Sequence, residues 1–197
     1  RMTPRPLLLL ATSLMAAMSV ALAKAKPEAA EAPKAETTSL LANGSFETLN
    51  ARGGPANWIN KQHAGVRAYE FRVVDEHARA DKHSLKLHRV KQQVWGKTEQ
   101  LVPVAPAMAG KTVEFEVWVR SEKVGKKGFV TWLGASANAT LLEHVKSEPV
   151  GGDNDWTKSS LRLEIPEYTT QLVVAVTLED AGTIWIDDAT LRVIDSE

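Results

Sequence analysis

Apolar and polar residues alternate strictly along several short stretches of this chain. In residues 113–120 (VEFEVWVR), three valines and Phe115 occupy the odd positions, while charged residues and Trp118 occupy the even ones. Residues 160–166 (SLRLEIP) repeat the pattern with two leucines and an isoleucine. A period of two places alternate side chains on opposite faces, as in a β-strand that buries one face. Both stretches are therefore predicted strands.

Further runs are rich in the β-branched and aromatic residues that favour strands, namely SLKLHRV, GFVTWLG, QLVVAVTL and GTIWIDDATLRVI. Turn-forming groups separate them, namely RGGP, MAGK, KVGKKG, VGGDND and EDAG. Residues 137–148 (ANATLLEHVKSE) leave a short helix or a loop excursion open. About eight or more short strands, spaced by about ten residues, predict an all-β fold, an antiparallel β-sandwich of the jelly-roll type.

The first 23 residues have a different pattern. Arg1 and Arg5 precede the apolar run PLLLLATSLMAAMSVALA, which ends in Ala21-Leu22-Ala23. Positive charge, an apolar stretch and a small-x-small end are the features of a secretory signal peptide. An uncleaved membrane anchor is the alternative, but a run of about 18 residues is at the lower limit for a span. We therefore predict an exported protein, periplasmic or secreted, with no membrane span after cleavage.

Residues 24–39 contain Ala, Pro, Glu and Lys and no large apolar side chain. Such a segment cannot offset its ordering entropy by burial, so we predict a flexible linker followed by one domain over residues 40–195. A short Ala/Glu helix is the alternative, which Pro27 and Pro33 disfavour.

Charge and cysteine content exclude several classes of function. Without Arg1 and Arg5, 22 basic residues stand against 24 acidic ones, so the chain from residue 24 has a net charge of −2. That balance gives no basic surface for nucleic acid. The chain has no cysteine, which excludes disulfides, thiolate metal sites and a thiol nucleophile. Burial of a core must therefore hold the domain together, and a bound metal could help.

Several short sequence motifs occur in the same order as in a known protein family, which this chain therefore resembles. LLANGSFE, GPANWI and HSLKL resemble the opening of carbohydrate-binding modules of families four, nine and twenty-two. VPVAPAMAGKTVEFEVWVRSE resembles their Gly-Lys turn before an aromatic-rich strand, and DWTKSSLRLEIPEYTTQLVVAVTLEDAGTIWIDDATL resembles their closing half. The resemblance spans residues 40–193, nearly the whole chain after the linker. It implies a galactose-binding-domain-like jelly roll, in which Phe46 enters the core. It implies a ligand less directly, because one fold hosts many functions.

The resemblance also implies a structural calcium ion that joins the first and last strands. Carried over, Glu47 is a side-chain ligand, backbone oxygen around Asn43 contributes, and Asp187 is the partner carboxylate. A carbonyl near Lys82 completes the set, and Asp188 is the alternative to Asp187. Calcium takes six to eight oxygen ligands, which can come from separate segments. The alternative is that Glu47 is a solvated turn acid and that Asp187 caps a strand end.

Six tryptophans offer aromatic surfaces for sugar rings. The apolar face of a pyranose stacks on such a surface, while nearby polar side chains bond the hydroxyl groups. Trp58, Trp156 and Trp185 are predicted to be structural. Trp185 belongs with them because it shares a parity with Leu191 and Val193 on its strand.

Trp118 differs because it lies on the polar face of its strand, between Glu116 and Arg120. A strand of a sandwich has one buried and one solvated face. We predict a carbohydrate-binding platform there, with Trp132 beside it on the next strand and Trp95 at its rim. The alternative is that Trp118 packs under a loop and Trp95 shields an edge.

Signals for catalysis are weak. The five histidines, at positions 63, 77, 83, 88 and 144, show no HExxH spacing, and no GxSxG nucleophile elbow occurs. No carboxylate pair stands out for glycoside hydrolysis. We therefore predict a non-catalytic module that binds carbohydrate. A structural or protein-interaction module without a sugar site is the second hypothesis, and an unrecognised hydrolase is the third.

Overall fold

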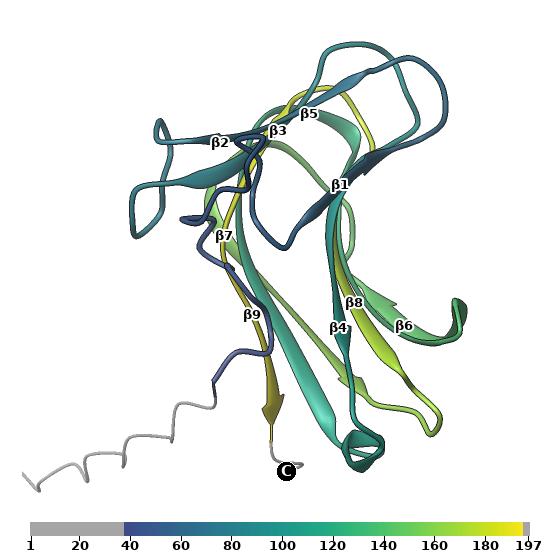
Figure 1. Ribbon diagram of the computed structural model, residues 1–197. Helices are drawn as coiled ribbons and strands as arrows, with labels where there is room; N and C mark the ends of the chain where they lie inside the picture. Colours follow the sequence, from purple (N-terminus) through teal and green to yellow (C-terminus); the bar gives the residue numbers. More distant parts are fainter. Residues whose placement is uncertain (1–37, 195–197) are drawn as a thin grey trace, which may run out of the picture. The chain divides into compact units, whose positions relative to one another are not determined.

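Within residues 38–194, which the computed structural model describes, nine antiparallel strands form two layers that share one long strand (Figure 1). In chain order the strands are β1 (Ile59–Gln62), β2 (Tyr69–Val74), β3 (Ser84–Arg89), β4 (Gly96–Pro103), β5 (Thr112–Ala137), β6 (Thr140–Lys146), β7 (Val150–Glu164), β8 (Gln171–Leu178) and β9 (Thr183–Ile194). One turn of 3-10 helix, Pro106–Met108, lies between β4 and β5. The predicted all-β fold is confirmed.

Strand β5 joins the two layers. Its first part, residues 112–122, pairs with β7 and β9, and β9 continues through β3 to β2. Its last part, residues 129–137, pairs with β6 and β8, and β8 continues through β4 to β1. We call these layers the first sheet and the second sheet. All of these pairings are antiparallel, as the predicted jelly-roll sandwich requires.

Two of the predicted turns lie inside strands. Residues 123–128 (KVGKKG) belong to β5, and residues 150–155 (VGGDND) belong to β7. Gly128 has a φ of +73°, and a Cβ there would lie 2.8 Å from the backbone nitrogen of Val150. The register between β5 and β7 shifts along this stretch, as it does at β-bulges that bend a strand without ending it. The runs 113–120 and 128–134 are therefore parts of one strand.

Residues 140–146 form β6, in place of the helix or loop considered for residues 137–148. Asn138 and Ala139 have φ values of 49° and 66°. Two consecutive residues with positive φ make a tight hairpin turn whose twist matches that of the flanking strands. Asn adopts this backbone conformation more readily than most residues, so Asn138 is the local reason for the hairpin.

The inward faces of the two sheets form the hydrophobic core. Val113, Phe115, Val117 and Val119 of β5 are at most 1% exposed, as their alternation predicts. The second sheet contributes Leu133, Leu172, Val174, Val176 and Leu178. Burial of side chains of this size stabilises the fold by about 1.5–3 kcal/mol each. Because side chains alternate along each strand, each sheet also presents an outer face.

The stretch before β1 packs along the last strand. The amide of Ala189 donates a hydrogen bond of 2.9 Å to the carbonyl of Gly44. Phe46 is fully buried, and its ring centroid lies 5.1 Å from that of Trp58, which is also buried. The predicted entry of Phe46 into the core and the structural role of Trp58 are both confirmed.

A β-bulge in β9 changes which of its side chains face inward. Asp188 has a φ of 46°, and the register between β5 and β9 shifts beside it. Ile184 and Leu191 both belong to the core, although their sequence positions differ by an odd number and regular alternation would place them on opposite faces. Trp185 therefore lies on the outer face of the first sheet, where its indole N–H donates to Glu76 at 3.2 Å. Trp185 is 3% exposed, as expected of a structural residue, but the bulge reverses the parity on which its placement between the sheets depended.

Residues 1–37 lie outside the described residues, so the predicted signal peptide and most of the predicted linker are not covered by the structure. Within residues 38–194, no helix has the length and apolar character that crossing a membrane requires.

Candidate functional site

The outer face of the second sheet holds an aromatic residue and a carboxylate in one cross-strand row. Trp132 on β5 is paired with Ala175 on β8, and Ala175 is paired with Glu99 on β4. Paired residues of antiparallel strands point to the same side of a sheet. Since adjacent strands are about 4.8 Å apart, Trp132 and Glu99 face the same way about 10 Å apart, with the small Ala175 between them. We call this surface the Trp132 face.

Local packing holds the Trp132 ring against the sheet. A Cβ at Gly134 would lie 2.1 Å from Cη2 of Trp132, so the indole covers this glycine. His144 on β6 is paired with Gly134, and its ring stacks with the indole at 5.8 Å between centroids and 27° between planes. Gly134 and His144 therefore fix the indole on the outer face, where an aromatic ring is a surface on which sugar rings stack.

Two lysines hold Glu99 in place. Its side chain is 4% exposed, and its carboxylate is ion-paired with Lys61 of β1 and with Lys97, whose Nζ lies 2.6 Å from Oε2. Burial acts to raise the pKa of Glu99, but hydrogen bonds from Lys61 and Lys97 outweigh it and lower the pKa overall. Glu99 is therefore ionised at neutral pH and orients two ammonium groups. Such charged groups form strong hydrogen bonds with hydroxyl groups.

Trp95 extends the same face beyond the start of β4. It stands two residues before Lys97 and four before Glu99, so all three side chains point to one side. Lys97 Nζ lies 5.6 Å from the centroid of the Trp95 ring, and the His63 ring packs edge-on against it at 6.0 Å. The structure therefore brings two of the predicted sugar-binding residues, Trp95 and Trp132, to one face.

The other three predicted residues, Glu116, Trp118 and Arg120, lie on the outer face of the first sheet. The guanidinium of Arg79, from the loop between β2 and β3, covers the Trp118 ring at 3.8 Å from its centroid. Because β5 passes from one sheet to the other, Trp118 and Trp132 lie on the outer faces of different sheets. The prediction that they share one platform is therefore wrong.

Charges around Trp118 compensate one another. Glu116, Glu114 and Asp155 are paired with Lys158, Arg162 and Arg120, at 2.6, 2.8 and 2.7 Å. Trp118 therefore lies in a network of exposed ion pairs with its ring face already occupied. This arrangement matches the alternative in which Trp118 packs under a loop.

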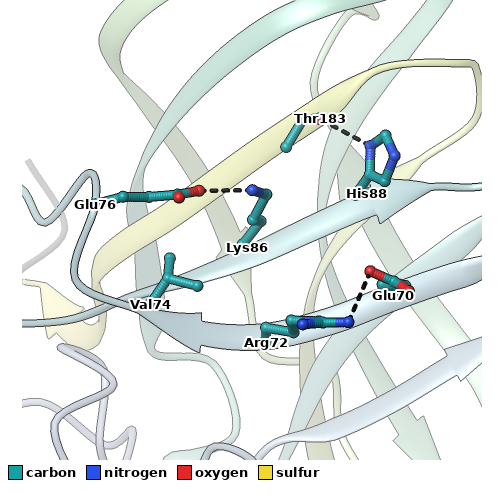
Figure 2. A pocket seen from close by; sticks show the side chains of 7 residues that line it. All are labelled: Glu70, Arg72, Val74, Glu76, Lys86, His88 and Thr183. Carbon is teal, nitrogen blue, oxygen red and sulfur yellow. Dashed lines mark hydrogen bonds and ion pairs between the residues drawn. The ribbon is translucent and has the colours of Figure 1, made fainter.

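A pocket of about 310 Å³ lies on the same outer face, between β2, β3 and β9 (Figure 2). Its polar side chains point at one another, as Figure 2 shows: Lys86 at Glu76, His88 at Thr183 and Arg72 at Glu70, with distances of 2.6, 2.8 and 3.3 Å. The hydrogen bond from Lys86 lowers the pKa of Glu76. These groups already bond one another, which makes the pocket less suited to a ligand than the Trp132 face.

Glu47 and Asp187, the predicted pair of calcium ligands, both hold the loop between β2 and β3. The Glu47 carboxylate accepts hydrogen bonds from the amides of Lys82 and His83, at 2.9 and 2.7 Å. Its other oxygen lies 2.8 Å from Nδ1 of His83. Asp187 accepts a hydrogen bond of 2.8 Å from the amide of Arg79. Asp187 therefore anchors the middle of this loop and Glu47 anchors its end before β3.

The two carboxyl groups differ in their electrostatic environment. Asp187 is 1% exposed, and this burial raises its pKa to about 6 against the opposing effect of the hydrogen bonds from the Arg79 and Asp188 amides. The neighbouring charge of Glu47 adds to the rise. For Glu47, partial burial acts to raise the pKa, but hydrogen bonds from His83 and Lys82 lower it overall.

Two of the residues that the resemblance assigns to calcium make hydrogen bonds through nitrogen atoms. Lys82 directs its amide rather than its carbonyl at Glu47. Asn43 donates from its side-chain amide to the carbonyls of Thr48 and Ala56. In the part of the chain that the structure describes, no three His, Cys, Asp or Glu side chains are grouped to hold a metal ion. Calcium also takes oxygens from backbone carbonyls and water, which this grouping does not include, so calcium binding stays a prediction.

Sequence reasoning missed most of the polar residues of the Trp132 face, namely Lys61, Lys97, Glu99, His144 and Lys146. Strand β4 shows why, because both of its faces are polar near Glu99. Gln100 points inward, is 5% exposed and bonds the amide of Ala42 at 2.8 Å. A period of two therefore could not show which side of β4 is the outer one, and only the pairing of strands reveals it.

Comparison with known proteins gives a fold but no close relative. No family model matches the sequence, and no curated protein matches it. The enzymatically active domain of tailspike protein 4 of bacteriophage CBA120 is 12% identical, with a TM-score of 0.65. That match covers 79% of this chain and 21% of the tailspike chain, so this chain spans about a fifth of it.

Two further structures match over nearly their full length. TmCBM61, solved with β-1,4-galactotriose, is 17% identical with a TM-score of 0.57, over 80% of this chain and 100% of its own. The Stig cyclase Fisc from Fischerella sp. TAU is 13% identical with a TM-score of 0.58, over 82% and 99%. Modules of carbohydrate-binding families 22, 16 and 4 are similar as well.

The fold is that of carbohydrate-binding modules. The resemblance seen in the sequence is therefore confirmed at the level of the fold. A cyclase and a tailspike domain share the carbohydrate-binding-module fold, so the fold alone does not decide between binding and catalysis.

Proposed function

We propose that this domain binds carbohydrate on the Trp132 face and does not catalyse a reaction. The observation that carries the proposal is the row of Trp132, Ala175 and Glu99, in which an aromatic surface and an ionised carboxylate face the same side of one sheet. A pyranose ring stacked on the indole directs its hydroxyl groups sideways along the sheet. The ammonium groups of Lys61 and Lys97, which the buried Glu99 carboxylate orients, donate hydrogen bonds to such hydroxyls.

The comparisons support carbohydrate as the class of ligand. TmCBM61 was solved with β-1,4-galactotriose, and the family 22 module from Paenibacillus barcinonensis Xyn10C is a xylan-binding domain. The signal peptide predicted for residues 1–23 supports export to the periplasm or the medium, where polysaccharides occur.

Binding without catalysis is supported by the composition of the same row. Glycoside hydrolysis needs a second carboxyl group facing the first across the scissile bond. The other members of the Glu99 row in the described sheet are Ile59, Ala175, Trp132 and Lys146, none of which is an acid. Glu99 itself is held ionised by its two lysines, so it is a poor proton donor.

A glycan array probed with the purified protein, with calcium and with chelator, tests the proposal. We expect binding to at least one class of plant, microbial or host oligosaccharide. Trp132→Ala should weaken that binding by about tenfold or more, because it removes the stacking surface. Trp156→Ala, a matched change in β7 of the first sheet, should bind as the unaltered protein does.

Two outcomes would contradict the proposal at different levels. If Trp118→Ala abolishes binding and Trp132→Ala does not, the site lies on the first sheet and the assignment to the Trp132 face is wrong. If no glycan binds, carbohydrate binding is refuted. A structural or protein-interaction role then becomes the better interpretation of the domain.

A further inference from the structure

The charges on the Trp132 face do not cancel. Glu99 is shared by two cations, Lys61 and Lys97, so this group keeps one positive charge. On the other side of the row, Lys146 is paired in register with Trp132. Lys146 has no acidic partner among the described residues, which leaves a second positive charge beside the indole. The nearby acidic residues Glu148 and Glu179 lie beyond the ends of β6 and β8, outside the paired strands of this face.

The outer face of the first sheet has the opposite character. Its cations are ion-paired with carboxylates of the same surface, namely Arg72 with Glu70, Lys86 with Glu76, Lys158 and Arg192 with Glu116, Arg162 with Glu114, and Arg120 with both Asp155 and Glu122. The chain is close to neutral as a whole. The positive excess is therefore a local feature of the Trp132 face, not a consequence of the overall charge.

We propose that the saccharide bound by the Trp132 face is anionic, a glycan that carries carboxylate or sulfate groups; this inference rests on the proposed function. Lys146 is paired with Trp132 on the neighbouring strand, whose backbone lies about 4.8 Å away. Lys61 and Lys97 stand on the other side, beyond Ala175. A sugar ring stacked on Trp132 thus has a cation within reach on either side, which suits a polymer with anionic groups along its length.

Charge and stacking make separate contributions to such a complex. The ammonium groups attract any polyanion over about a Debye length, an attraction that falls as salt rises. The indole ring recognises a sugar ring regardless of its charge. An anionic glycan uses both, so its binding should depend on Trp132 and on Lys146, and should weaken with salt.

The experiment measures binding of the full chain to four polymers by isothermal titration. These are polygalacturonate and alginate as uronates, dextran sulfate as a sulfate ester, and galactan as a neutral polymer. We expect at least one anionic polymer to bind about tenfold tighter than galactan, and the uronate and sulfate arms show which anionic group is taken. Raising NaCl from about 0.02 M to about 0.5 M should remove most of this preference.

Variants separate the specific site from general attraction. Lys146→Gln should weaken anionic binding about five- to tenfold and weaken any galactan binding by a clearly smaller factor. It breaks no ion pair seen in the described residues, so the fold should be intact. Lys158→Gln makes the same change of charge on the opposite face and should have no effect on binding.

The results distinguish this inference from the proposed function. Galactan binding as tight as anionic binding, and lost in Trp132→Ala, would overturn the inference and leave the proposed function standing. Anionic binding that survives Trp132→Ala would show general charge attraction and overturn the inference as well. Failure of all four polymers and of the glycan array would remove both.

Discussion

Asp187→Asn tests the buried carboxyl group that holds the loop between β2 and β3. Burial raises the pKa of Asp187 from its ordinary 3.8 to about 6. The folded protein therefore keeps a proton on Asp187 at pH values where the unfolded chain has released it. The stability contributed by this proton is fully present below about pH 4 and is lost as the pH rises through about 6.

The size of the effect follows from that difference in pKa. Two pKa units correspond to about 3 kcal/mol of unfolding free energy, at about 1.4 kcal/mol per unit. Asn has no proton to release, so the stability of the variant does not fall as the pH rises through about 6. Asn also has one acceptor oxygen where Asp187 uses two, for the amides of Arg79 and Asp188. The lost hydrogen bond costs about 1–3 kcal/mol, at every pH alike.

Urea unfolding of the unaltered protein and of Asp187→Asn, at about pH 4 and about pH 7.5 with a chelator present, separates the effect of the proton from that of the lost hydrogen bond. The destabilisation by Asp187→Asn should be about 3 kcal/mol smaller at the higher pH, since the hydrogen-bond cost cancels in the difference. Asp75→Asn, at an exposed residue of the same loop, is the control for the change from Asp to Asn. Destabilisation by Asp187→Asn that is equal at both pH values would refute the reasoning, because Asp187 would then titrate as an ordinary acid.

Three further predictions concern packing and metal. Gly44→Ala would place a Cβ 1.9 Å from the carbonyl oxygen of Ala189. We therefore expect the free energy of unfolding in denaturant to fall by about 1–3 kcal/mol or more. An unchanged free energy would show that the stretch before β1 does not pack on β9 as described. Gly134→Ala would place a Cβ 2.1 Å from the far end of the Trp132 indole; the ring should swing away, so glycan affinity should fall about tenfold while the thermal midpoint changes by only a few degrees. Calcium at 100 times its dissociation constant adds about 2.7 kcal/mol, so if the ion binds, chelation should lower the midpoint by several degrees, and an unchanged midpoint would contradict it.

The strands with one apolar face could be predicted from the sequence, because burial of that face is a local pattern. The first part of β5 shows this, with Phe115 and its neighbours buried as their alternation requires. Strand β6 could not be predicted in this way, since Leu141 and Leu142 are adjacent and both exposed. Its existence depends on the positive φ of Asn138 and on pairing with β5. The glycines of residues 123–128 suggested a turn because a bend and a turn use the same residue type.

The candidate site could be predicted only in part. Trp95 and Trp132 were recognisable as aromatic residues outside the core pattern, but their neighbours come from strands far apart in sequence. Glu99 is placed opposite Trp132 by two cross-strand pairings, through Ala175. Register of this kind is a property of the whole sheet, and a single bulge can reverse it, as Asp188 does for Trp185.

The order of the strands has a consequence for the newly made chain. Strand β8 lies between β4 and β5, and β9 lies between β3 and β5, although both follow every other strand in sequence. Neither sheet can close until residues 171–194 have left the ribosome. Until then, the apolar faces of the earlier strands remain exposed to water. Their pairing with β8 and β9 joins residues distant in sequence, and such contacts form slowly. Nascent molecules of this protein therefore pass through a long aggregation-prone stage, in which a chaperone that covers apolar segments would raise the yield of folded protein.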